Sequence, residues 1–365
     1  MEKGRISGFQ FTVLVMGFIQ GSTLLLAFAI PITKHDTWLI LLAGAAIMIP
    51  FSICYAALAQ RFPGWNLIQM NRMIYGKYLG TLISTFYVYW IFNVFSFNVR
   101  TLGDFYTTFL MPETPLLFFL VGFTLVCAYA VWKGIEVMAR IGPVLVAIIL
   151  LNIISTFLLL VGSMDFSHFF PLFEAPFPKL IQGTHIIATI PFGEMVIFLA
   201  ITPALKNPKV TKKYLLWGVT LGAISLLIIQ IRNTATLGNT EFITTSPSFQ
   251  ASRLIDVERI FSRMDILVGI GQTVAIFLKC IIFYYATLVC LAQLLGLKNY
   301  LSLVLPVGGM AVILAATCWH SHAELLTDVS SAGPIFFTPF IFVIPPLSLL
   351  IAKLRNLPKQ GAGEG

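Results

Sequence analysis

The sequence predicts an all-α polytopic membrane protein of about ten transmembrane helices, arranged as a 5+5 inverted repeat with broken helices 1 and 6. The first observation is composition: 58% of the 365 residues are hydrophobic and 10% are charged, whereas soluble domains carry about 25% charged residues. The second is that about ten apolar segments approach or exceed the roughly 20 residues that cross a bilayer. The third is that two of them are interrupted at corresponding places.

The ten expected spans divide into five and five within a single transmembrane domain, 1–365. The first repeat covers about 8–162 and the second about 183–353, with a linker near 163–182. Because each half has an odd number of spans, the second enters the membrane with the opposite orientation. The expected spans are 8–33, 37–60, 79–110, 115–132, 139–162, 183–205, 214–237, 266–292, 300–319 and 332–353.

The interruptions in spans one and six predict the position of a small-molecule site near the bilayer midplane. Glycine and proline are poor helix formers, and freed backbone groups persist in lipid only where protein or a water-filled cavity satisfies them. Helix packing through a Gly-x-x-x-Gly motif is the alternative interpretation of the first interruption. The residues expected to bind the ligand are Gly17, Gln20, Gly21 and Ser22 in span one, Pro191, Phe192, Gly193 and Glu194 in span six, and Asn93 in span three.

Apart from Arg140 and Lys353 at the ends of their spans, five charged residues lie inside expected spans, and each is a functional candidate because a charge in lipid is costly. Glu194 and Lys279 lie near the centres of spans six and eight and are expected to pair, either to fix helix packing or to serve the ligand cavity or its gating. Arg100 and Asp104 lie one turn apart in the outer third of span three, which predicts a structural pair or part of an outer gate. Arg232, near the outer end of span seven, is expected to be interfacial.

Basic residues set the expected orientation. Fifteen lysines and arginines fall in the loops and tails on the side of the termini and five on the opposite side, so both termini are expected in the cytoplasm. The net charge of +8 therefore indicates membrane orientation and not a nucleic-acid partner.

Two loops carry amphipathic patterns. Residues 61–78 predict a short helix on the cytoplasmic surface. On the outer side, the stretch 251–264 predicts a helix that either covers an entrance or is a solvated loop helix. Asn93 and Asn98 on span three are expected to bond to neighbouring helices, with a ligand contact as the alternative.

Patterns typical of enzymes and cofactor sites do not occur in the sequence. Its five cysteines are isolated in apolar segments, no histidine spacing indicates a metal, and no nucleophile elbow, phosphate loop or paired catalytic carboxylates are found. The expectation is a protein that is not an enzyme and has no cofactor.

Three stretches, in this order and spacing, resemble the spore germination permeases, which are the membrane B subunits of nutrient germinant receptors. The resemblance covers about residues 6–355 and implies membership of the amino acid/polyamine/organocation superfamily. It also implies a small nutrient ligand, a germinant receptor A subunit and a lipoprotein C subunit as partners, and the spore inner membrane as location. The stretches are Phe97-Asn98-Val99-Arg100 through Phe109-Leu110-Met111-Pro112-Glu113-Thr114-Pro115, Phe192-Gly193-Glu194-Met195-Val196 with the basic loop 206–213, and Ser246-Pro247 through Arg259-Ile260-Phe261.

The leading hypothesis is a transporter-like receptor subunit that binds a small nutrient, such as an amino acid, between spans one and six and triggers germination. Free N–H groups at half-helix N-termini suit a ligand carboxylate. A proton- or sodium-coupled amino-acid permease is the alternative, and a scaffold with a vestigial cavity is a third possibility.

Overall fold

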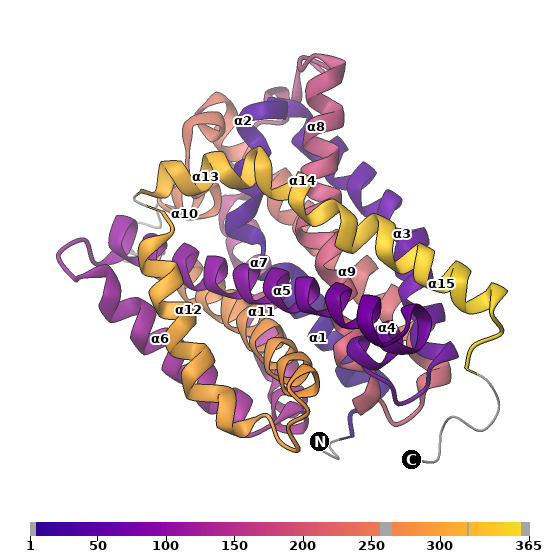
Figure 1. The fold of residues 1–365 in the computed structure, drawn as a ribbon. Coiled ribbons are helices and arrows are strands. Elements are labelled where there is room, and N and C mark those ends of the chain that lie inside the picture. Colours follow the sequence, from indigo (N-terminus) through magenta and orange to yellow (C-terminus); the bar gives the residue numbers. More distant parts are fainter. Residues whose placement is uncertain (1–4, 256–264, 320, 359–365) are drawn as a thin grey trace.

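The computed structural model describes residues 5–255, 265–319 and 321–358, and a helix or broken helix stands at each of the ten expected spans (Figure 1). In this part of the chain, seven helical stretches are long and apolar enough to cross a membrane, and three shorter apolar helices accompany them. The unbroken spans are α3 (Thr37–Arg61), α5 (Lys77–Phe105), α6 (Leu116–Trp132), α7 (Ile135–Leu160), α9 (Thr211–Leu237), α11 (Asp265–Leu294) and α12 (Val304–Thr317).

The first span is broken as the sequence predicts. Helix α1 (Gly8–Gln20) starts at a capping box, in which Ser7 accepts from the Gln10 amide and Gln10 accepts from the Ser7 amide. It ends at Gly21, and the chain continues as a 3-10 segment, Thr23–Phe28, and the short helix α2 (Ile30–Thr33). The helical path therefore changes at the position expected from the sequence.

The sixth span is also broken where the sequence predicts. It begins with α8 (Phe177–Ile187), earlier than the expected start at 183. Ile190 leaves the helical region with φ −126° and ψ 115°, and Pro191 follows without a backbone donor. A second piece, Gly193–Ala200, completes the span and is buried along its whole length.

The tenth span consists of α14 (Ala332–Thr338), a wider turn over Pro339–Val343, and α15 (Ile344–Leu354). Helix α13 (His322–Ser330) precedes it and lies at the end of the molecule away from the two termini (Figure 1). The sequence-based assignment left this stretch between spans nine and ten without an element.

The spans differ in how much of their surface contacts other parts of the protein. In the most apolar 18-residue segment of each span, 89% of the residues are buried for 177–200 and 83% for 265–294. The corresponding share is 28% for 135–163 and 332–354, which therefore present most of their surface outward. Broken helix 6 and α11 thus form the interior, where a site can be shielded from lipid.

The predicted amphipathic helix of the 61–78 loop is confirmed as α4 (Leu67–Tyr75). Asn66 caps it, and Leu67, Ile68 and Ile74 are buried against the rest of the protein. In the second loop, α10 (Pro247–Ser252) and residues 253–255 precede residues 256–264, which lie outside the described residues. The expected outer helix over 251–264, with Arg259 and Arg263, falls largely on that stretch.

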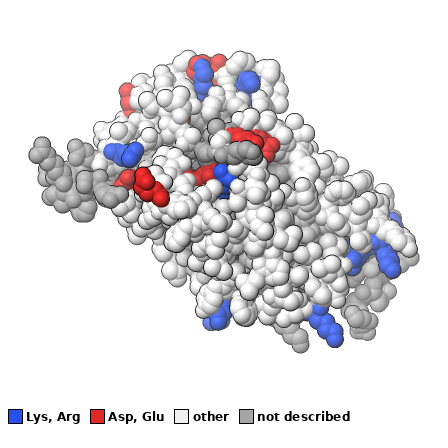
Figure 2. All heavy atoms as spheres, turned by 60° about the vertical axis from the view of Figure 1, so that its left-hand side comes forward, with Lys and Arg blue, Asp and Glu red and all other residues white. Residues whose placement is uncertain are grey.

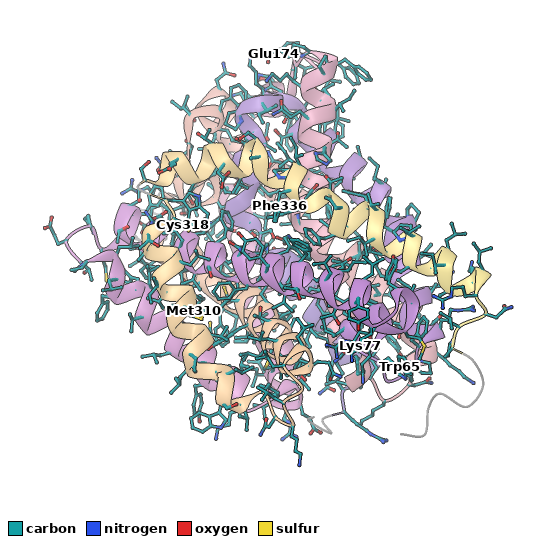
Figure 3. The ribbon with its side chains drawn as sticks, viewed as in Figure 1. Trp65, Lys77, Glu174, Met310, Cys318 and Phe336 are labelled. Atoms are coloured by element: carbon teal, nitrogen blue, oxygen red, sulfur yellow. The ribbon has the colours of Figure 1, made fainter. Side chains whose placement is uncertain are left out.

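The visible acidic side chains gather at one end of the molecule, whereas basic side chains occur at both ends (Figure 2). In the view of Figure 2, only basic side chains mark the lower part, toward the termini, while the acidic side chains that are visible lie in the upper part. Figure 3 places Trp65 and Lys77 near the end with the termini and Glu174 at the opposite end. A wide uncharged surface lies between, as expected for a protein embedded in a bilayer.

Candidate functional site

A buried ion pair joins the two broken helices to α11. Lys279 Nζ lies 2.6 Å from Glu194 Oε2, and the two side chains are 0% and 1% exposed. The same ammonium donates to Ser22 Oγ at 2.6 Å. Glu194 follows the break in helix 6 and Ser22 follows the break in helix 1, so one lysine contacts both interruptions.

Aromatic rings complete the surroundings of the ammonium. Lys279 Nζ lies 5.5 Å from the centre of the Phe18 ring and 5.8 Å from that of Phe283. A buried charge is tolerated when it is paired and its remaining protons find acceptors, and aromatic faces add attraction. The charge on Lys279 is therefore held by Glu194, Ser22 and two rings from α1 and α11.

Gly21 allows the close approach of helix 1 to α11. A Cβ at this position would lie 2.5 Å from Lys279 Cβ and 2.7 Å from the Ala275 carbonyl oxygen. Gly17 has a similar role one turn earlier, because a Cβ there would lie 2.6 Å from Leu278 Cδ1. The glycines therefore serve close packing, and the helix also unwinds directly after them, so both interpretations of the motif describe part of the structure.

A cavity of about 310 Å³ lies beside this pair. Glu194 connects the two, since it pairs with Lys279 and also lines the cavity. Figure 3 labels Phe336, one of the lining residues, on α14, and its ring centre lies 6.3 Å from that of Tyr89 on α5. The lining residues are Tyr89, Asn93, Val94, Phe97, Ile190, Glu194, Trp319, Asp328, Val329, Ala332, Gly333, Phe336 and Phe337.

The wall of the cavity around Trp319 is held by a second ion pair. Arg100 Nε donates to Asp104 Oδ1 at 2.7 Å, so the two residues pair one turn apart on α5, and both are buried. Arg100 Nη1 also donates to the carbonyl oxygens of Ala315 (3.0 Å) and Trp319 (2.7 Å) at the end of α12. The guanidinium thereby fixes Trp319, whose indole donates to Asp328 Oδ2 at 3.3 Å.

The structure divides the residues that the sequence assigned to ligand binding. Asn93 and Glu194 line the cavity, and Ser22 contacts the ion pair. Gln20 instead donates to Ser225 Oγ on α9. Gly193 instead serves close packing, because a Cβ at this position would lie 2.7 Å from Ile341 Cγ2.

Pro191 and Phe192 belong to the fully buried break in helix 6 and are not among the residues that line the cavity. They shape the path of the chain that brings Ile190 and Glu194 to the cavity wall. These two residues therefore contribute to the site by setting the path of the backbone, and their side chains do not line the cavity.

The expectation that Arg232 is interfacial is wrong. Its side chain is buried, donating to Thr156 Oγ1 at 2.5 Å and to Asn233 Oδ1 at 2.8 Å. Glu241, also buried, accepts from Gln230 and Thr234 nearby. The reason is that α7 packs beside this end of α9 and supplies Thr156 as a partner, a contact between distant segments that the sequence does not reveal.

The two asparagines of span three also differ from expectation. Asn93 Nδ2 donates to the Tyr89 carbonyl oxygen at 2.8 Å and Asn98 Nδ2 to that of Val94 at 2.7 Å, both one turn earlier on α5. The bonds that the structure shows for these amides therefore stay within their own helix.

Asp328 and Trp319 were missed as site residues because they lie at the edge of span nine and in the stretch after it. A signal was present in the sequence. Ser321 and Glu324 have the spacing of a helix start, and Ser321 Oγ accepts from the Glu324 amide at 3.2 Å. Among the described residues, no group of three His, Cys, Asp or Glu side chains could hold a metal ion.

Comparisons with known proteins agree with this architecture. The profile of the family described as "Spore germination protein" matches residues 5–323. Spore germination protein KB of Bacillus subtilis (strain 168) is 28% identical over 368 residues, covering 99% of this chain and 98% of the relative. The chain belongs to this family of spore germination proteins.

Solved transporter structures share the fold. MhsT in complex with L-phenylalanine has a TM-score of 0.69 at 13% identity, covering 97% of this chain and 99% of that one. MHP1, a nucleobase-cation-symport-1 family transporter, has a TM-score of 0.67 at 14% identity, covering 93% and 79%. The fold class expected from the sequence, ten helices with breaks in helices 1 and 6, is confirmed.

Proposed function

We propose that this protein is the transporter-like membrane subunit of a spore germinant receptor, which binds a small nutrient in the cavity beside Glu194 and triggers germination. The observation that carries the proposal is that Glu194 belongs to both the cavity wall and the ion pair that links the two broken helices. A ligand in this cavity touches the region where both interrupted helices meet α11.

The link between binding and output follows from conformational equilibrium. A receptor needs only a ligand that binds one conformation more tightly than another. The regular α-helical hydrogen-bond pattern is already interrupted at both breaks, so these are the elements whose change disturbs it least. A nutrient beside Glu194 favours one arrangement, and the partner subunits respond to it.

The proposed setting is the spore inner membrane, with both termini in the cytoplasm and with an A subunit and a lipoprotein C subunit as partners. The family membership supports the setting, and the basic residues near the termini support the orientation. The boundaries of the two repeats, about 8–162 and 183–353, belong to the same proposal.

A proton- or sodium-coupled amino-acid permease is the second candidate, and the shared fold with transporters such as MhsT favours it. Two measurements separate the candidates. Spores that lack this protein are screened for germination against single nutrients, and vesicles that contain the protein alone are tested for uptake of the same labelled nutrients.

The receptor proposal predicts loss of the response to particular nutrients, restored by the wild-type gene, without concentrative uptake in vesicles. Uptake that follows a proton or sodium gradient supports the permease instead. Germination that is unchanged for every nutrient, in spores without the protein, contradicts the receptor proposal.

A further inference from the structure

We propose that Asp328 on α13 selects ligands that carry a positive charge, so that the cavity takes small molecules with an ammonium group and an apolar body. This inference rests on the proposed function, since it names the ligand class of the same cavity. Asp328 was not among the residues that the sequence pattern assigned to the site.

The charge of the cavity wall is the first argument. Two carboxylates line the cavity, those of Asp328 and Glu194, and no lysine, arginine or histidine is among the described residues that line it. Lys279 lies behind Glu194 and offsets that charge. The remaining negative charge at the cavity is that of Asp328, which attracts a cation and disfavours a ligand whose net charge is negative.

The aromatic lining is the second argument. Five of the lining side chains are aromatic: Tyr89, Phe97, Trp319, Phe336 and Phe337. Aromatic faces attract ammonium groups and also accept apolar surface. A ligand with an ammonium group and an apolar body contacts both the carboxylate and the aromatic rings of the wall. A polyhydroxylated neutral ligand leaves most of its polar groups without partners.

Asp328 is an exposed residue of α13 whose carboxylate contacts Trp319. Trp319 donates to Oδ2, and Trp319 itself is held by Arg100 and by the Phe97 ring at 5.8 Å between centres. A carboxylate accepts several hydrogen bonds on its two oxygens. One contact with the indole therefore orients Asp328 and leaves capacity for a ligand ammonium.

Helix α13 connects Asp328 to the broken helices. Its buried residues Leu325 and Val329 form a small apolar cluster with Phe28 of broken helix 1, Ile190 of broken helix 6 and Phe97 of α5. A ligand held by Asp328 thus contacts an element that rests on both interrupted spans. Through this packing, a cationic ligand bound at Asp328 acts on the two broken helices whose conformation changes in the proposed function.

The test measures binding to the full-length protein in phospholipid nanodiscs by calorimetry. The probes are L-alanine, L-valine, L-leucine and L-phenylalanine, each with its decarboxylated amine and with the hydroxy acid that replaces the amino group. We expect at least one amino acid and its amine to bind, with the hydroxy acid at least tenfold weaker. Asp328→Asn should weaken binding of the amine about tenfold, and Asp328→Glu should retain most of it.

The matched control is Glu324→Gln, which removes a carboxylate from the same helix outside the cavity lining and should leave the affinity within about twofold. Equal binding of amine by wild type and Asp328→Asn overturns the inference, as does a hydroxy acid that binds as tightly as its amino acid.

The failure of this inference is distinct from the failure of the proposed function. If no amine or amino acid binds but a neutral nutrient such as D-glucose does, and spores need the protein to respond to it, the inference fails and the receptor proposal stands. If no probe binds and spores lacking the protein germinate normally with every nutrient, both fail.

Discussion

The buried pair of Lys279 and Glu194 is the most consequential contact at the scale of single residues. Both side chains are removed from solvent, and the ammonium contacts two broken helices at once. Breaking a buried pair by removing one partner costs about 3–5 kcal/mol, because the other charge is left uncompensated. The same contact therefore contributes to stability and lies where a ligand can influence it.

The first prediction concerns this pair. Glu194→Gln and Lys279→Met should each lower the abundance of folded protein in the membrane, and the double variant should recover much of it, because no unpaired charge remains. The measurement is immunoblotting of membranes together with thermal unfolding in detergent. If Glu194 also serves the ligand, the double variant recovers abundance without nutrient response.

The control for the pair is Lys298→Met, which removes an exposed lysine from a loop and should change neither abundance nor unfolding temperature. Single variants at Glu194 and Lys279 that behave like this control would contradict the pairing account. Recovery of both abundance and response in the double variant would assign the pair a purely structural role.

The second prediction concerns Gly21. Gly21→Leu should lower both stability and nutrient response, because even its Cβ would meet the Lys279 side chain and the Ala275 carbonyl. The control is Gly122→Leu on α6, where a Cβ meets nothing within 4 Å. Thermal unfolding and germination are measured for both, and equal behaviour of the two variants would refute the close-approach account.

At the scale of elements, the end of α12 depends on one side chain from α5. Arg100 bonds to Asp104 and to two carbonyl oxygens, one in the last turn of α12 and one two residues beyond its end, where intrahelical partners are missing. A planar guanidinium can serve these three acceptors together, whereas a lysine ammonium has one nitrogen. Arg100 therefore links the charge inside span three to the position of Trp319 and the cavity wall.

The third prediction follows from this link. Arg100→Lys should keep most of the protein folded but speed amide hydrogen exchange in peptides that cover residues 314–319, as the carbonyl contacts are lost. Hydrogen-exchange mass spectrometry in nanodiscs measures this. Arg140→Lys, an exposed site at the other end of the protein, is the control, and unchanged exchange in Arg100→Lys would contradict the capping role.

The elements differ in how far the sequence could predict them. The ten spans follow from apolar length, and the breaks follow from Gly21, Pro191 and Gly193, because backbone rules act locally. Helix α13 escaped prediction because it is short, and its apolar residues become buried only against segments distant in sequence.

The same distinction applies to the candidate site. The pairing of Glu194 with Lys279 could be predicted from the sequence because few charges lie inside spans. The residues that face this pair could not be identified, since packing sets which side of each helix meets its neighbours. Gln20 donates to Ser225 on α9, while Trp319 and Asp328 line the cavity from a loop and a short helix. Arg232 was misplaced for a related reason, because its partner Thr156 comes from α7, a helix distant in sequence.

At the scale of the whole molecule, the distribution of charge separates a basic end with the termini from an end that also carries acidic groups (Figure 2). The fourth prediction uses this asymmetry. In a cysteine-free background, Glu174→Cys should react with a membrane-impermeant maleimide added outside intact cells, and Lys77→Cys should react only after permeabilisation. These residues mark opposite ends of the protein (Figure 3), and the reverse pattern would invert the proposed orientation.

The central claim is that a nutrient bound beside Glu194 triggers germination, and a variant that fills the cavity tests it most directly. Gly333 lines the cavity, and a Cβ there would make only an ordinary contact with the Asp328 carbonyl oxygen at 3.4 Å. A leucine at this position therefore has room at its base, and the rest of its side chain takes up space that the ligand needs.

The measurement is the germination dose–response of spores that carry Gly333→Leu, with Gly309→Leu on the outward-facing side of α12 as control. The account predicts that Gly333→Leu raises the half-maximal concentration of the nutrient at least tenfold at normal protein abundance, while the control follows wild type. A response to nutrient that is the same in Gly333→Leu as in wild type would contradict the claim that this cavity receives the nutrient.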